Sequence, residues 1–276
     1  MTPNNNLSCL PFYDNLEDQN ARKWWVYGRV YPLYCDGALL PFQILTDISY
    51  NDYENNTHTI TVQLYHNGGW VQYITEMAFV VINNNGYAQI QYIPGESMGQ
   101  ITNHGIGPWW LRLRVNVENV GSRYYYSEVF TLVSDMTPYL KIKWWDNETL
   151  VSDGGTIFYT GGYKNFLYLQ ADIAKPQYEF EDEEENRDGY SFPVKQISKK
   201  KYRFSFIASE FMLDVMRLIR LSDYIEITYA GKTYKPSSFL ITPDWVDNGD
   251  VATVDAEFET DTVVKKLGKG YLMSSE

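Results

Sequence analysis

The sequence has few of the residues that build metal, redox or nucleic-acid sites. Among its 276 residues are two cysteines and three histidines, Cys9, Cys35, His58, His66 and His104. So few, scattered ligands argue against a structural zinc site. Lys and Arg number 23 against 35 Asp and Glu, a net charge of −12. Because phosphate binding needs clustered basic side chains, this balance argues against non-specific nucleic-acid binding.

Targeting signals and long apolar runs are also missing. No segment approaches the run of about 18 apolar residues that a membrane-spanning helix needs. The first twenty residues have neither a basic region nor an apolar core, so we expect no secretory signal. Without such a signal, we expect Cys9 and Cys35 to be free thiols.

Motifs for catalysis are not found either. The chain has no phosphate-binding loop, no G-x-S-x-G nucleophile elbow and no EF-hand spacing. His104 lies in a turn-rich loop, where a histidine is mostly structural. Scattered Asp and Glu residues offer many pairs to a glycosidase-like site and favour none. We predict no enzyme activity, no catalytic residue, no cofactor and no metal.

What the sequence has in abundance is aromatic residues and strand patterns. Aromatics make up 16% of the chain, including 24 tyrosines and 8 tryptophans, which excludes a disordered chain. Residues 1–21 are polar and are predicted to form an extended N-terminal arm, either disordered or docked on a neighbouring subunit. Seven or eight short strands, with no amphipathic helix, predict an Ig-like β-sandwich over residues 22–135. The run 57–66 and the return at 70–74 predict a hairpin.

Residues 136–266 are predicted to form a second, β-rich α+β domain with one helix. A polar, proline-containing segment at 134–138 marks the boundary. Ser209 is a candidate helix cap, and Phe211, Val215, Leu218 and Ile219 recur at helical spacing. The last ten residues, 267–276, are predicted to be a flexible tail. The fold class is thus mainly β, in two domains.

Three Trp-Trp pairs and a Tyr triplet are candidates for an interaction surface. Neighbouring residues of a strand point to opposite faces, so one Trp of each pair belongs to the core and the other to a surface. Aromatics are enriched at protein interfaces. We predict interface roles for Trp25, Trp110, Tyr125 and Trp145. The alternative is a carbohydrate-binding or adhesive module, at a tail tip or on a surface protein, in which exposed rings stack on sugars.

Charge is concentrated in two neighbouring segments. The acidic run 179–185 is predicted to be a solvated loop, and the basic segment 195–203 to lead into an edge strand that lysines protect from pairing. Opposite charges on one domain could also join copies head to tail around a ring. We therefore add Glu181, Glu183, Lys199 and Lys201 to the candidate interface.

The second half resembles a known group of proteins. The resemblance rests on the strings YSEVFTLVSD (126–135), IKWWDN (142–147), LYLQADIAKPQYEFEDEEE (167–185), YRFSFIASEFMLDVMRLI (202–219), DYIEITYAGKTYK (223–235) and DVATVDAEFETDTVVKK (250–266). They resemble structural virion proteins of crAss-like tailed phages that infect gut Bacteroidetes. The resemblance implies a non-enzymatic, ring-forming subunit of the neck or tail below the portal, located in the virion and assembled in the host cytoplasm. Its implied partners are copies of itself and other tail, neck or portal proteins, with no specific nucleic acid and no membrane.

Overall fold

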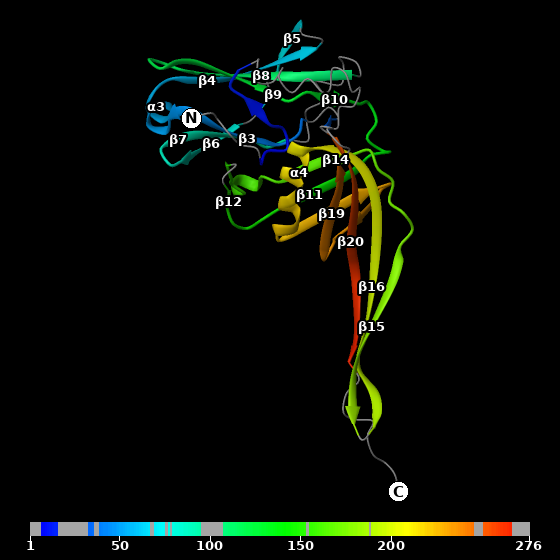
Figure 1. The fold of residues 1–276 in the computed structure, drawn as a ribbon. Coiled ribbons are helices and arrows are strands. Elements are labelled where there is room, and N and C mark those ends of the chain that lie inside the picture. The colour runs from blue at the N-terminus through cyan, green and yellow to red at the C-terminus, as the bar shows by residue number, and fades with distance from the viewer. Residues whose placement is uncertain are drawn as a thin grey trace.

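The structure is a computed structural model that describes residues 7–15, 33–35, 39–66, 69–74, 77, 79–94, 107–152, 155–187, 189–245 and 251–266. Within these ranges the protein is mostly β-strand, as predicted, and the strands form five sheets. Figure 1 shows the sheets of the first half above those of the second, with a long ribbon running away from both.

The first half contains two sheets. The larger has seven strands: β1 (Phe12–Tyr13), β2 (Tyr34–Cys35), β4 (His58–His66), β5 (Gly69–Ile74), β8 (Gly107–Val117), β9 (Gly121–Ser127) and β10 (Phe130–Leu132). The smaller has three: β3 (Phe42–Ser49), β7 (Tyr87–Tyr92) and β6 (Phe79–Asn84), in the order β3-β7-β6. Side chains of both sheets belong to one buried cluster. The predicted sandwich and the β4–β5 hairpin are therefore confirmed.

Local sequence explains two details of this half. Asn85 and Gly86 connect β6 to β7 with φ angles of 50° and 88°, the pair of positive values that a tight hairpin turn requires. A short helix, α3 (Tyr50–Asn55), follows β3 and was not predicted. Its six residues bury only Tyr53, too little for helical periodicity to be visible in the sequence.

The second half contains three sheets. One has the order β14-β11-β17-β18: β14 (Asn165–Leu169), β11 (Leu140–Trp145), β17 (Tyr224–Tyr229) and β18 (Lys232–Tyr234). A small hairpin pairs β12 (Leu150–Ser152) with β13 (Gly155–Ile157). The longest sheet has the order β15-β16-β20-β19: β15 (Gln177–Arg187), β16 (Tyr190–Ser209), β20 (Val251–Lys266) and β19 (Ser238–Trp245).

The predicted helix is present where its apolar spacing placed it. α4 (Glu210–Met216) continues into a 3-10 helix, η3 (Arg217–Leu221); another 3-10 turn, η2, spans Thr160–Gly162. Phe211, Val215, Leu218 and Ile219 are all buried. Ser209 occupies the N-cap position, but its side chain makes no capping hydrogen bond. Packing of the apolar face, not the cap, therefore holds this helix.

Residues 7–13, assigned to the extended N-terminal arm, pack on their own chain. Leu7 joins a buried cluster with Ile157 and Tyr163 of the second half, and the Cys9 thiol donates to Asn165 Oδ1 over 3.4 Å. Phe12 begins β1, which pairs with β9 of the first half. This short segment thus touches both halves, because its apolar side chains find partners in each.

Buried amides also join the halves. Gln43 Nε2 and Gln91 Nε2 donate to the Phe158 carbonyl over 2.7 and 2.8 Å, and Gln89 Nε2 donates to the Thr156 carbonyl over 2.8 Å. The hydrophobic cluster of the sandwich continues into the second half. A buried amide that lost these partners would carry an unsatisfied polar group, so the hydrogen bonds fix how β3 and β7 meet residues 155–158.

Candidate functional site: two aromatic surfaces and a charged arm

Three of the four aromatic interface candidates lie within the described residues. Trp110 and Trp145 are partly exposed while their neighbours Trp109 and Trp144 are buried, so both pairs divide between a core and a surface as strand geometry requires. Trp25 lies outside the described residues.

Tyr125 is not on the surface. It is 2% exposed and belongs to the core cluster. Its hydroxyl donates to Asp47 Oδ1 over 3.1 Å, and Arg123 pairs with the same carboxylate over 2.8 Å. Burial, followed by the charge of Asp47, raises the pKa of Tyr125 well above its ordinary value. The interface role predicted for Tyr125 does not fit this position: alternation along β9 points its ring inward and leaves Tyr124 and Tyr126 facing out.

Trp110 belongs to an aromatic surface on the outer side of the seven-stranded sheet. We define the aromatic face as Tyr65, Trp70, Tyr73, Trp110, Arg112, Tyr124 and Tyr126. Trp110 stacks on Tyr65 with ring centroids 4.0 Å apart. The Arg112 guanidinium lies 5.2 Å from the Tyr65 ring and 5.4 Å from the Tyr124 ring. Trp, Tyr and Arg are the residues that most often dominate binding energy at interfaces.

Trp145 forms a separate, smaller aromatic surface. It stacks on Tyr224 across β11 and β17, with centroids 5.1 Å apart, and Lys164 Nζ lies 3.8 Å from the Trp145 centroid. Asn147 Nδ2 donates to Asp223 Oδ2 and to Tyr224 Oη over 3.1 and 3.3 Å. The ammonium group on the Trp145 ring restricts the area on which a sugar could stack.

The four charged candidates lie on β15 and β16, two strands of the long ribbon of Figure 1. We define the arm as residues 177–187 of β15, 190–200 of β16 and 260–266 of β20. The acidic run was predicted to be a loop, but it is strand β15, paired with β16 from Gln177 to Arg187. The basic segment was predicted to be an edge strand, but it is central, between β15 and β20. Lysines of β16 lie next to the carboxylates of β15 and offset the repulsion among them. This repulsion was the reason for predicting a loop.

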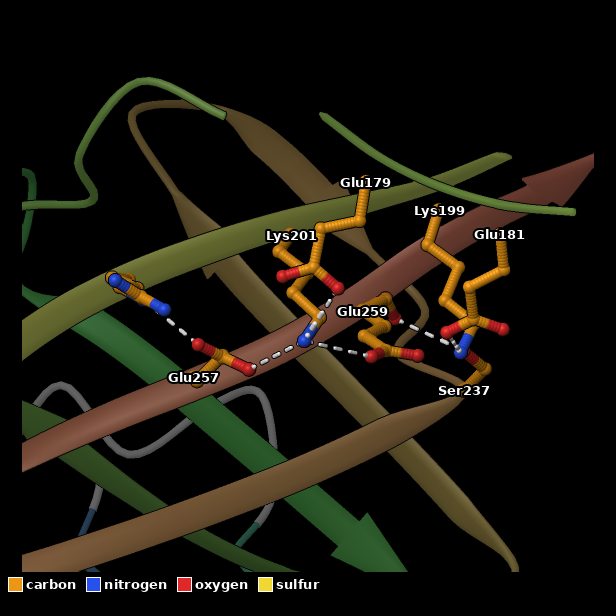
Figure 2. A network of polar contacts seen from close by, with 8 residues as sticks. Glu179, Glu181, Lys199, Lys201, Ser237, Glu257 and Glu259 are labelled. Carbon is orange, nitrogen blue, oxygen red and sulfur yellow. Dashed lines mark hydrogen bonds and ion pairs between the residues drawn. The ribbon is translucent and has the colours of Figure 1, made fainter. Parts of the chain in front are cut away.

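Ion pairs line one face of this sheet, and Figure 2 shows those around Lys199 and Lys201. Lys199 Nζ lies 2.7 Å from Glu181 Oε1, and Lys195 Nζ lies 3.6 Å from Glu183 Oε2. The acidic and basic segments, which could have joined two copies, thus pair within one chain. Exposed pairs of this kind each contribute little stability.

Lys201 occupies the most enclosed position in the network. Its Nζ lies 3.0 Å from Glu179, 3.1 Å from Glu257 and 3.4 Å from Glu259. Hydrogen bonds to Glu179 and Glu257 raise the pKa of Lys201 well above its ordinary value. Burial alone would raise the pKa of Glu257, but bonds from Arg203 and Lys201 outweigh it and lower that pKa. The network therefore holds these groups in their charged forms.

The opposite face of the arm carries exposed apolar side chains among polar ones. Tyr178 and Phe180 alternate with the glutamates of β15, and Val263 lies on β20. Phe180 is opposite Ser198, which is opposite Val263, so the three share one row and one face. Phe180 is 76% exposed and Val263 is 63% exposed. Sequence reasoning missed this face, although the alternation Tyr-Glu-Phe-Glu at 178–181 carried the signal.

Other candidate chemistry is sparse in the described residues. His58 Nδ1 and His66 Nδ1 contact the carbonyls of Tyr53 and Pro108 over 2.9 and 2.8 Å, while His104 lies outside the described residues. Cys9 and Cys35 are buried. Within the described ranges no group of three or more His, Cys, Asp and Glu side chains could hold a metal ion. The helices described there are also too short or too polar to cross a membrane.

Comparisons with known proteins identify no family. No protein-family model matches the chain, and no curated protein matches it significantly. Among solved structures, the crystal structure of Dpr2 Ig1-Ig2 in complex with DIP-Theta Ig1-Ig3 aligns with 85% of this chain and 92% of that one, at 10% identity and a TM-score of 0.15. A TM-score this low carries no conclusion about fold or function.

Proposed function

We propose that this chain is a non-enzymatic structural subunit that assembles with copies of itself, as a ring in the neck or tail of a phage particle. The observation that carries the assembly part is the arm, which extends Phe180 and Val263 away from any core. Apolar side chains and unpaired strand edges placed together in solvent invite association. The placement within a phage particle is supported by the sequence resemblance of the second half.

The aromatic face supports the same proposal. A ring subunit contacts neighbours on two sides, so it needs more than one adhesive surface. The aromatic face and the arm belong to different sheets in different halves of the chain, so one surface can serve a neighbouring copy while the other serves an adjoining ring. Trp110 and Arg112 already pack on the Tyr65 ring, so these side chains lose little conformational freedom on binding.

The oligomeric state tests the assembly part. Mass photometry and light scattering of the purified full chain, from nanomolar to micromolar concentration, are expected to show one closed oligomer, and electron microscopy is expected to show rings. A chain that remains monomeric throughout would overturn the proposal. Labelling of purified phage particles by an antibody against the chain tests the particle assignment.

The carbohydrate-binding alternative rests on two rings of the aromatic face. Trp70 and Tyr73 are each more than half exposed, and their centroids lie 5.6 Å apart in an edge-on arrangement. Exposed rings of this kind can stack on sugars. The alternative predicts glycan binding that the double substitution Trp70→Ala and Tyr73→Ala abolishes. A glycan array without any binding would leave assembly as the function of this face.

A further inference from the structure

Two open strand edges flank the arm, and they differ in charge. Among the described strands nothing pairs with the outer edge of β15, and β19 accompanies β20 only as far as Glu259. The β15 edge carries six carboxylates between residues 179 and 185. The free part of β20, by contrast, carries two lysines, Lys265 and Lys266, and one carboxylate, Asp261. Neither Asp182 nor Lys265 forms an ion pair within the described part of the chain.

The charges decide which edges can meet. Two β15 edges side by side would place carboxylates next to carboxylates, and like charges on neighbouring strands are destabilising. Pairing β15 with the free edge of β20 from another copy avoids this repulsion. Such a contact joins two different surfaces, so it leads from copy to copy, and it gives a ring when the rotation between neighbouring copies closes.

Register identifies the residues that would meet. β15 and β20 are each antiparallel to β16, so they run in the same direction. Phe180, Ser198 and Val263 form one row across the arm, and Asp182, Gln196 and Lys265 form another. When neighbouring copies are related by a rotation about an axis parallel to the arm, each row of one copy lies at the same height as the same row of the next copy. Phe180 of one copy then lies beside Val263 of the next, and Asp182 beside Lys265, each pair on the same face.

We propose that arms of neighbouring copies join edge to edge, with β15 of one copy parallel to residues 260–266 of β20 in the next. This inference rests on the proposed self-assembly and names its contact. The joined arms form a continuous sheet with three strands from each copy, in which Phe180 covers Val263 and Asp182 pairs with Lys265. Main-chain hydrogen bonds supply the affinity, and the side-chain rows set the register.

A cysteine pair tests this register directly. Within one chain β16 separates Asp182 from Lys265, so their Cα atoms lie about 9.5 Å apart, two strand spacings. A disulfide needs about 4.4–6.8 Å, so Asp182→Cys with Lys265→Cys can only crosslink different copies. The native cysteines are buried. Mild oxidation of this variant is expected to give a ladder of covalent oligomers on a non-reducing gel. The control is Asp182→Cys with Arg220→Cys, because Arg220 is exposed on η3, outside the arm. The control is expected to give no such ladder.

Charge exchange provides a second test, with the folding of each variant checked by thermal melting. Asp182→Lys alone and Lys265→Asp alone are each expected to weaken self-association about tenfold per contact. The combined variant restores it, because the two charges have exchanged places. The matched control Lys235→Asp, an exposed lysine outside the arm, leaves association unchanged.

The outcomes separate the two proposals. A wild-type oligomer whose Asp182→Cys, Lys265→Cys variant forms no crosslink, and whose association does not respond to charge exchange, overturns the arm contact and leaves self-assembly standing. A wild-type chain that stays monomeric overturns both. Crosslinking together with rescue by the combined charge variant establishes the contact.

Discussion

The same strands behave differently at the two ends of the longest sheet. At its base, residues 202–209 of β16 and 251–258 of β20 place Tyr202, Phe204, Phe206 and Phe258 in the core. In the arm, the same face continues as Tyr178, Phe180 and Val263, with no core beneath it. The base is held by burial, whereas the arm is held by strand pairing and ion pairs. Three strands can therefore extend far from the core, but at low local stability.

The largest expected difference comes from removing one aromatic ring at each end. Phe258 is fully buried and stacks on Tyr202 with centroids 5.1 Å apart. Phe258→Ala is expected to lower the free energy of unfolding by about 3–5 kcal/mol. The matched substitution Phe180→Ala deletes the same ring atoms from a solvent-exposed position. It should change the free energy of unfolding by less than about 0.5 kcal/mol. Urea denaturation of dilute, monomeric protein measures both; equal losses would contradict the comparison.

Acid should open the arm before the base. Pairing with Lys199 lowers the pKa of Glu181, in the arm, below the ordinary 4.5. A carboxylate with a lowered folded-state pKa stabilises the fold above its unfolded value, and this contribution disappears as the pH falls through the folded value. Hydrogen exchange followed by mass spectrometry should therefore show residues 177–187 and 190–200 of the arm losing protection below pH 4.5 while residues 202–209 keep it. Simultaneous loss at both ends would show that ion pairs do not hold the arm.

The smallest effect concerns the junction of arm and base. Lys201→Gln leaves Glu179, Glu257 and Glu259 without their shared cation. We expect a loss of about 1 kcal/mol, because a network contributes more than a single exposed pair. Lys195→Gln, which removes one pair of 3.6 Å, serves as the control and should have no measurable effect. High salt should reduce the difference between the two variants; a difference that salt leaves unchanged would point to packing instead.

Sequence patterns located the regular elements where alternation or helical spacing was long enough to detect. The β4–β5 hairpin and the helix beginning at Glu210 are examples. The charged arm was misassigned because a dense run of carboxylates resembles a solvated loop until the lysines opposite them are known. Tyr125 was misassigned because a Tyr triplet does not reveal which ring faces inward. In both cases the residues contact partners that are distant in the sequence. The periodicity of one strand does not reveal such partners.

The sequence alone determined that this chain is acidic, aromatic and mainly β, because composition and alternation act through local geometry and solvation. Only the tertiary structure decided that the acidic and basic segments neutralise each other within one sheet, that residues 7–13 join the two halves, and that apolar side chains lie exposed along the arm. Each of these depends on which strand becomes the neighbour of which, and the free energy of that choice comes from contacts between residues far apart in the chain.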